Sequence, residues 1–138
     1  MARVSQVMAP AMRNRQDISM IKGNDGYFYL DAELNDFVYW GFPVQVEQNR
    51  VIDAIEVEIY GGEIEAGGYI ASAYYFGGEV AVVETHPSPF GTPGQWTTVK
   101  FTKNDIWQTD EARTYWVIVK SKPTRKEEFR IRGINVVY

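Results

Sequence analysis

The only histidine of the chain, His86, carries the one imidazole that could act near neutral pH as a general base or metal ligand. It opens the stretch HPSPFGTPGQW (86–96) and is followed by Pro87 and Ser88. Ser88 does not lie in the Gly-x-Ser-x-Gly elbow that presents a nucleophilic serine, and the chain contains no cysteine. We therefore assign no catalytic residue and expect a protein that is not an enzyme. The prolines and glycines instead predict a stiff, projecting loop between two strands.

Paired carboxylates are the second feature with chemical potential. Glu56 and Glu58 alternate along one stretch, and Glu63 and Glu65 follow it, which is formally compatible with two-carboxylate glycosidase chemistry. Alternating acids on a strand more commonly form its solvent-facing side. A structural Ca²⁺ site at a strand end is an open alternative, with Asp53, Glu63 and Glu65 as its candidate ligands. No EF-hand spacing is present, so we assign no metal site and no cofactor.

Aromatic residues make up 14% of the chain, and exposed rings offer flat faces to sugars. For any single ring, packing in the core or at an interface is the simpler interpretation. Tyr74 and Tyr75 must point to opposite faces if their strand is regular. The candidate residues for a glycan-binding platform are Tyr74, Trp96 and Trp107.

Short apolar runs separated by turns would position these residues. The run 51–60 is the clearest, because Ile55, Val57 and Ile59 alternate with Glu56 and Glu58. Pro43 restricts strand pairing at its position to an edge or a strand end. About eight strands are expected on this spacing of runs and turns. They cover 27–34, 36–42, 51–60, 69–76, 79–85, 95–102, 114–121 and 128–138.

No stretch offers the crossover helices that a parallel sheet requires, so the strands must be mainly antiparallel. The predicted fold is all-β: an antiparallel β-sandwich of jelly-roll or Greek-key type that spans residues 27–138. Apolar residues in 1–26 recur at no regular spacing, and the segment ends in KGNDG, a sequence typical of a turn. This pattern predicts an N-terminal extended arm. Such an arm is either disordered or ordered against a partner.

Charge is unevenly distributed in this chain of net charge −4. Acidic residues dominate 31–99 and basic residues dominate 100–138, which favours attraction between the two regions within one fold or between copies. The absence of an Arg/Lys stripe argues against nucleic acid as a partner. No apolar run is long enough to span a membrane, so no membrane partner is expected.

The strand sequences GQWTTVKFT, TYWVIVK and FRIRGINVVY, preceded by the polar arm, resemble small jelly-roll proteins of phage virions. The resemblance implies a structural virion protein, made in the host cytoplasm, that decorates a capsid or serves as an accessory head or tail subunit. It implies a homo-oligomer, with a trimer expected, and contacts to the major capsid or another virion protein. The expected contact residues are Met8, Met12, Arg13, Arg15, Phe90 and Trp96.

The same strand patterns are also similar to carbohydrate-binding sandwich modules. The alternative function is therefore a carbohydrate-binding module or adhesin domain that uses an aromatic surface. The resemblance transfers no ligand residue in either case.

Overall fold

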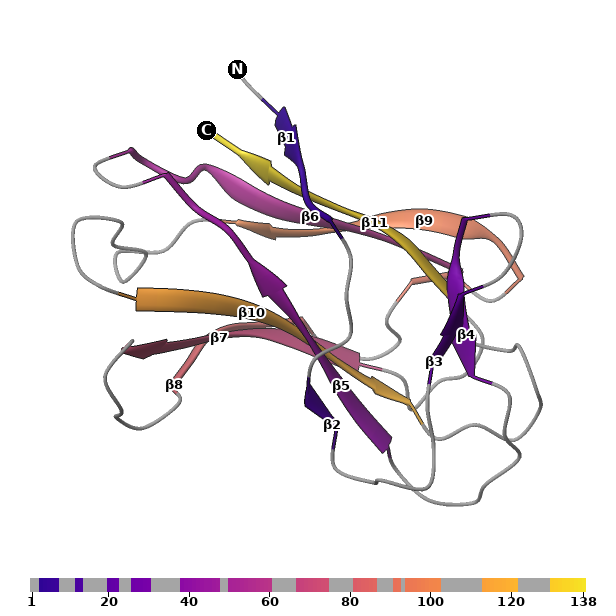
Figure 1. Cartoon of the computed structure of the whole chain (residues 1–138). Helices are drawn as coiled ribbons and strands as arrows, with labels where there is room; N and C mark the ends of the chain where they lie inside the picture. Colours follow the sequence, from indigo (N-terminus) through magenta and orange to yellow (C-terminus); the bar gives the residue numbers. More distant parts are fainter. Residues whose placement is uncertain are drawn as a thin grey trace.

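The computed structural model describes residues 3–7, 12–13, 20–22, 26–30, 38–47, 50–60, 67–74, 81–86, 91–92, 94–102, 113–121 and 130–138. Side chains are described for 3–7, 26–29, 39–47, 50–60, 91–92, 94–102, 115–119 and 130–138. The ordered elements in these ranges are all β-strands, arranged in two facing layers (Figure 1). The described residues contain no helix of the length and apolarity that crossing a membrane requires.

The first layer, sheet A, has the strand order β3-β4-β11-β6-β9, and β1 also pairs with β11. Every pairing in the sheet is antiparallel. Because β4 and β1 pair with different parts of β11, they lie along the same edge of that strand. The strand bounds are β1 (Arg3–Ser5), β3 (Met20–Lys22), β4 (Phe28–Leu30), β6 (Ala54–Tyr60), β9 (Trp96–Thr102) and β11 (Arg130–Val137).

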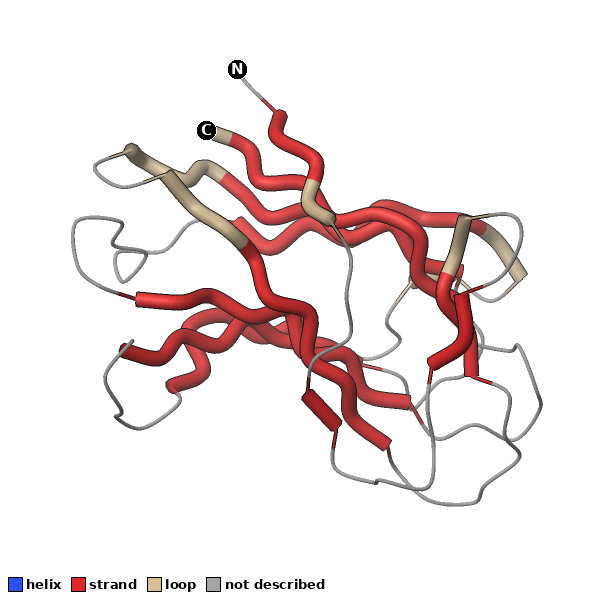
Figure 2. Tube along the Cα trace, viewed as in Figure 1, coloured by secondary structure: helices blue, strands red, loops and turns tan. Residues whose placement is uncertain are grey.

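The second layer, sheet B, has the order β2-β5-β10-β7-β8 and is also antiparallel. The chain passes repeatedly between the layers, so most neighbours within a sheet are distant in sequence, as in jelly-roll sandwiches (Figure 2). The strand bounds are β2 (Met12–Arg13), β5 (Val38–Val44), β7 (Gly67–Tyr74), β8 (Ala81–His86) and β10 (Arg113–Ser121). The predicted all-β antiparallel sandwich is confirmed.

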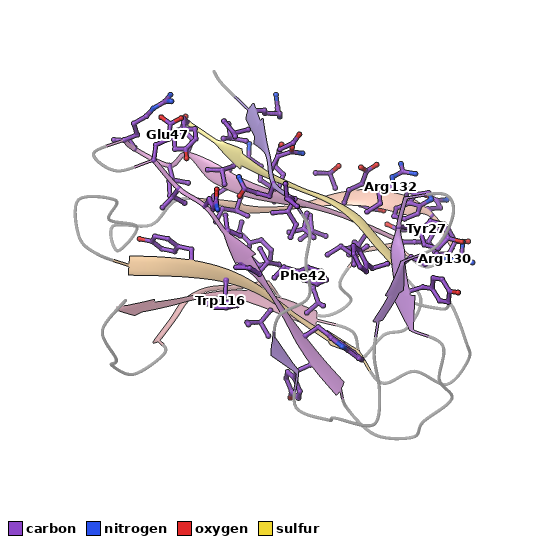
Figure 3. The ribbon with its side chains drawn as sticks, in the orientation of Figure 1. Tyr27, Phe42, Glu47, Trp116, Arg130 and Arg132 are labelled. Carbon is purple, nitrogen blue, oxygen red and sulfur yellow. The ribbon has the colours of Figure 1, made fainter. Side chains whose placement is uncertain are left out.

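The core lies between the sheets and follows directly from the alternation of apolar residues along the strands. In β6, Ile55, Val57 and Ile59 are fully buried, as the sequence predicts. Phe42 of β5 lies between the layers and contacts Phe28 edge-on at 6.1 Å between ring centroids (Figure 3). Each such side chain contributes roughly 1.5–3 kcal/mol by leaving water. The remaining core residues are Trp40, Val44, Ile52, Val99, Phe101, Tyr115, Val117, Val119, Ile131, Ile134 and Val136.

The eight predicted strands from 27–34 onward each overlap one observed strand, β4 to β11, and β5, β7, β8 and β10 extend beyond the predicted bounds by one or more residues at one end. Pro43 lies one residue before the end of β5, opposite Trp116 of β10. β2 pairs with β5 only at Gly41 and Trp40, so Pro43 has no described neighbour on the β2 side. Pro43 therefore lies near a strand end, where a residue without an N–H is tolerated.

The segment 1–26 contributes three short strands to the sandwich itself. β1 pairs with β11, β2 with β5 and β3 with β4. The sequence interpretation treats 1–26 as an arm apart from the sandwich, but its described parts are integrated into both sheets. The physical reason is that strands of two or three residues are too short to show a hydrophobic period, and β1 and β2 pair with strands far along the chain.

A candidate binding surface on sheet A

A row of four side chains crosses the outward face of sheet A. In the strand register, Tyr29 of β4 opposes Arg130 of β11, Arg130 opposes Tyr60 of β6, and Tyr60 opposes Trp96 of β9. Neighbouring strands lie about 4.7–4.9 Å apart, so the row spans roughly 14–15 Å. We call these four residues the aromatic row. All four are half-buried, which leaves part of each side chain open to a ligand.

Ring contacts hold the row together. Tyr60 and Trp96 meet edge to face, with centroids 5.6 Å apart and planes at 67°. Tyr27, which directly precedes β4, contacts Tyr29 and Trp96 with centroid distances of 5.9 Å to each. Aromatic pairs of this kind are worth about 0.5–1.5 kcal/mol beyond their buried area. The rings therefore position one another across strands that are far apart in sequence.

Two arginines of β11 lie over these rings. The guanidinium carbon of Arg130 is 4.5 Å from the ring centroid of Tyr60 and 5.3 Å from that of Tyr27. The guanidinium carbon of Arg132 is 3.9 Å from the ring centroid of Trp96, and its Nη2 donates to Oε1 of Glu58. Figure 3 shows Tyr27, Arg130 and Arg132 gathered at the β4 end of sheet A, away from Phe42.

Arg132 lies in a β-bulge of β11. Ile131 opposes Ile59 and Gly133 opposes Glu58, so Arg132 is the extra residue of β11. Bulges bend a strand locally and redirect side chains. A Cβ added at Gly133 would lie 3.5 Å from Oε2 of Glu58, an ordinary van der Waals contact, so this carboxylate lies close to Gly133.

A second charged group lies further along the same face. Nε of Arg3 donates to Oε1 of Glu56 at 2.7 Å, and Ser5 Oγ donates to Asn135 Oδ1 at 3.0 Å. The hydrogen bond from Arg3 lowers the pKa of Glu56 below its ordinary value, and the charge of Lys100 acts in the same direction. These contacts attach β1 to the sheet. Lys100 opposite Glu56 and Arg132 beside Glu58 place bases from 100–138 next to acids from 31–99, as the distribution of charge along the sequence favours.

A comparable arginine stack lies at the other end of the sandwich. The guanidinium carbon of Arg50 is 4.2 Å from the ring centroid of Tyr138, and its Nη1 lies 2.7 Å from Oε2 of Glu47. Beside it is a cavity of about 390 Å³. Several of its polar groups are already bonded, since Gln6 accepts from Gln45 N and Tyr138 accepts from Glu47 N, each at 2.8 Å. The lining residues are Val4, Ser5, Gln6, Val7, Pro43, Gln45, Val46, Glu47 and Tyr138.

The sequence predicts several contact or glycan-binding residues. Among those that the structure describes, Trp96 alone lies on the aromatic row. Tyr74 ends β7 in sheet B, so it belongs to the other sheet from Trp96. Met12 and Arg13 form β2, whose backbone alone is described. The other expected site residues lie outside the described residues: Met8, Arg15, Phe90 and Trp107.

Of the remaining chemical candidates, Asp53 and the backbone of His86 are described, and both lie away from the aromatic row. His86 ends β8 opposite Gly68 of sheet B, and its side chain lies outside the described set. Asp53 is exposed before β6, and its backbone N–H donates to the carbonyl of Val137 at 2.7 Å. Glu63 and Glu65 lie outside the described residues.

Sequence reasoning missed most of the surface, namely Tyr27, Tyr29, Tyr60, Arg130 and Arg132. The sequence does contain part of the information. Tyr60 follows Glu56 and Glu58 at the same two-residue spacing, which places it on the outward face, and Arg130 and Arg132 flank the buried Ile131. Which strands are neighbours is not encoded in this alternation, so it could not bring the five residues together.

Neither a protein-family model nor a curated protein matches the sequence. Similar solved structures do exist. The family 29 carbohydrate-binding module CBM29_1 from Piromyces equi matches with a TM-score of 0.55 and 14% identity, over 99% of this chain and 91% of that chain. The C-terminal CBM6 of LamC, a marine laminarinase from Zobellia galactanivorans, matches with a TM-score of 0.52 and 17% identity, over 99% and 100%. This chain therefore shares the β-sandwich fold of carbohydrate-binding modules.

Proposed function

We propose that this protein is a non-catalytic carbohydrate-binding module whose ligand lies along the aromatic row. The observation that carries the proposal is the row itself: Tyr29, Tyr60 and Trp96 present half-buried rings in register, with Arg130 of β11 between Tyr29 and Tyr60. A sugar ring has apolar C–H faces and polar edges, which suits partly exposed aromatic surfaces bordered by hydrogen-bond donors.

The fold comparison supports this alternative over the virion protein that the strand patterns first resemble. The two solved structures are carbohydrate-binding modules, and neither is a virion protein. Self-association and binding to capsid proteins stay predictions from sequence.

The test is binding of the full chain to a panel of neutral and charged polysaccharides, by affinity electrophoresis and titration calorimetry. Trp96→Ala and Tyr60→Ala should each weaken binding roughly 5- to 150-fold, since stacked rings contribute on the order of 1–3 kcal/mol. Trp116→Ala is the matched control, because Trp116 is half-buried in sheet B between the core residues Tyr115 and Val117.

Two results would overturn the proposal. One is the absence of binding to any polysaccharide in the panel by correctly folded protein. The other is loss of binding in Trp116→Ala but not in Trp96→Ala, which would indicate that the binding site lies on sheet B. Thermal unfolding of each variant checks that the fold is retained.

A further inference from the structure

The outward face of sheet A is basic, although the protein as a whole is acidic. Among the described side chains of β1, β6, β9 and β11, the outward charged residues are four bases and two acids. The chain carries a net charge of −4. The bases are Arg3, Lys100, Arg130 and Arg132, and the acids are Glu56 and Glu58. Local potential at this face therefore favours an anionic ligand.

Stacking orients the two arginines of the row for recognition. A guanidinium that lies over a ring uses its flat face for the contact, while its five N–H donors remain in its plane. Arg130 lies over Tyr60, and Arg132 lies over Trp96. A planar group with two oxygens, such as a carboxylate, matches the donor fork of each guanidinium.

The structure already contains one carboxylate beside a stacked guanidinium, held by a single hydrogen bond. Glu58 accepts from Nη2 of Arg132 while Arg132 is stacked on Trp96. The side chains of Arg132 and Glu58 are 39% and 37% exposed, so solvent and ligands reach the pair. A carboxylate thus fits beside the stacked guanidinium, and an incoming anion would compete with Glu58 for its donors.

We infer that the ligand of the aromatic row is a carboxylated sugar chain, that is, a polysaccharide containing uronate residues. The inference rests on the proposed function, because the rings supply the sugar platform. Arg130 and Arg132, which lie over Tyr60 and Trp96, would bind carboxylates of the chain, and its sugar rings would contact the parts of these aromatic side chains that the arginines leave exposed.

The experiment measures binding of the full chain to polygalacturonate, alginate and hyaluronate. Fully methyl-esterified polygalacturonate serves as the neutral counterpart of the first polymer, and a carrageenan provides sulfate instead of carboxylate. At least one uronate polymer should bind at least tenfold more tightly than the neutral and sulfated polymers. Added NaCl should weaken this binding, because exposed charges are screened.

Variants separate the arginines from the rings. Arg132→Lys and Arg130→Lys should each weaken uronate binding roughly tenfold, since lysine lacks the planar donor fork. Arg50→Lys is the matched control and should leave it unchanged, because Arg50 forms the same type of stack and ion pair away from the row. Glu58→Gln should strengthen uronate binding severalfold without changing binding of neutral sugars.

The outcomes distinguish this inference from the proposed function. Binding of neutral polysaccharides that needs Trp96, without preference for uronates, overturns the inference and leaves the proposed function standing. Tighter binding of the sulfated polymer also overturns it. Failure to bind any polysaccharide overturns both. Weaker uronate binding in Glu58→Gln contradicts the competition between Glu58 and the ligand.

Discussion

The guanidinium of Arg132 covers the ring of Trp96, with 3.9 Å between the guanidinium carbon and the ring centroid. Arg132 is the extra residue of a β-bulge in β11, and Trp96 begins β9, two strands away in sheet A. The contact therefore bridges over β6, whose Glu58 binds the same arginine. One irregularity in β11 thus connects three strands on the surface that we propose binds sugar.

The stacking of Arg132 on Trp96 should be measurable as a coupling free energy. A double-mutant cycle of Arg132→Gln and Trp96→Leu, followed by urea unfolding, should give a coupling of about 0.5–1 kcal/mol. A cycle of Arg50→Gln with Trp96→Leu is the control and should show additivity, because Arg50 stacks on Tyr138 instead. Additivity of the first pair as well would contradict the contact.

Gly94 should be replaceable by asparagine at lower cost than by alanine. Its φ of 72° lies in the left-handed region, and Gln95 N–H donates to Thr92 O at 3.2 Å across this turn. Nothing lies within 4 Å of a Cβ added at Gly94, so the cost comes from the backbone alone. Gly94→Ala should destabilise the protein by about 1–2 kcal/mol and Gly94→Asn by less, as measured by urea unfolding. Equal effects would argue against this conformation.

Phe42→Ala should destabilise the sandwich by about 3–5 kcal/mol, because it opens a cavity between the sheets. Val51→Ala is the control, since Val51 is 59% exposed and should change stability by less than about 0.5 kcal/mol. Chemical denaturation with a constant m-value checks both. A small effect of Phe42→Ala would place this residue outside the core.

The attachment of β1 should weaken in acid. Because Arg3 lowers the pKa of Glu56 in the folded protein, the pair stabilises the fold above the ordinary Glu value of 4.5. This contribution is lost as the pH falls through the lowered pKa. Glu56→Gln should therefore reduce stability at pH 7, and the difference from the unsubstituted protein should shrink below pH 4.5.

Arg3→Gln should remove the same pH-dependent contribution, and combining it with Glu56→Gln should add little. Hydrogen exchange of the amides of β1 and β11 across this pH range would follow the attachment directly. A difference between Glu56→Gln and the unsubstituted protein that is independent of pH would contradict the role of the ion pair.

Deletion of residues 1–7 should destabilise the sandwich and expose part of β11. This deletion removes β1, whose three residues pair with Asn135, Val136 and Val137. An exposed strand edge promotes pairing between chains, so self-association should increase. Urea unfolding and size-exclusion chromatography with light scattering measure the two effects. An arm that only contacts a partner predicts the opposite: unchanged stability and loss of any oligomer.

Features set by neighbouring residues in the chain can be predicted from the sequence, whereas features set by the pairing of distant strands cannot. The alternation of Ile55, Val57 and Ile59 identifies β6 and its buried face without further information. β1 to β3 were missed, because strands of two or three residues gain their stability from pairing and not from their own pattern. Trp96 was singled out as an aromatic at a strand start, but its partners Tyr60 and Tyr27 required the strand order.

The position of β11 also has a consequence for biosynthesis. β11 joins β4 and β1 on one edge to β6 on the other, and it is the last described strand to leave the ribosome. Until residues 130–137 emerge, β6 and β9 have no described link to β3 and β4. Sheet A must therefore be completed after translation of nearly the whole described chain. Such long-range closure is typical of sandwiches that fold in milliseconds to seconds. A chaperone that holds the apolar face of β6 during this interval would therefore raise the yield of folded protein.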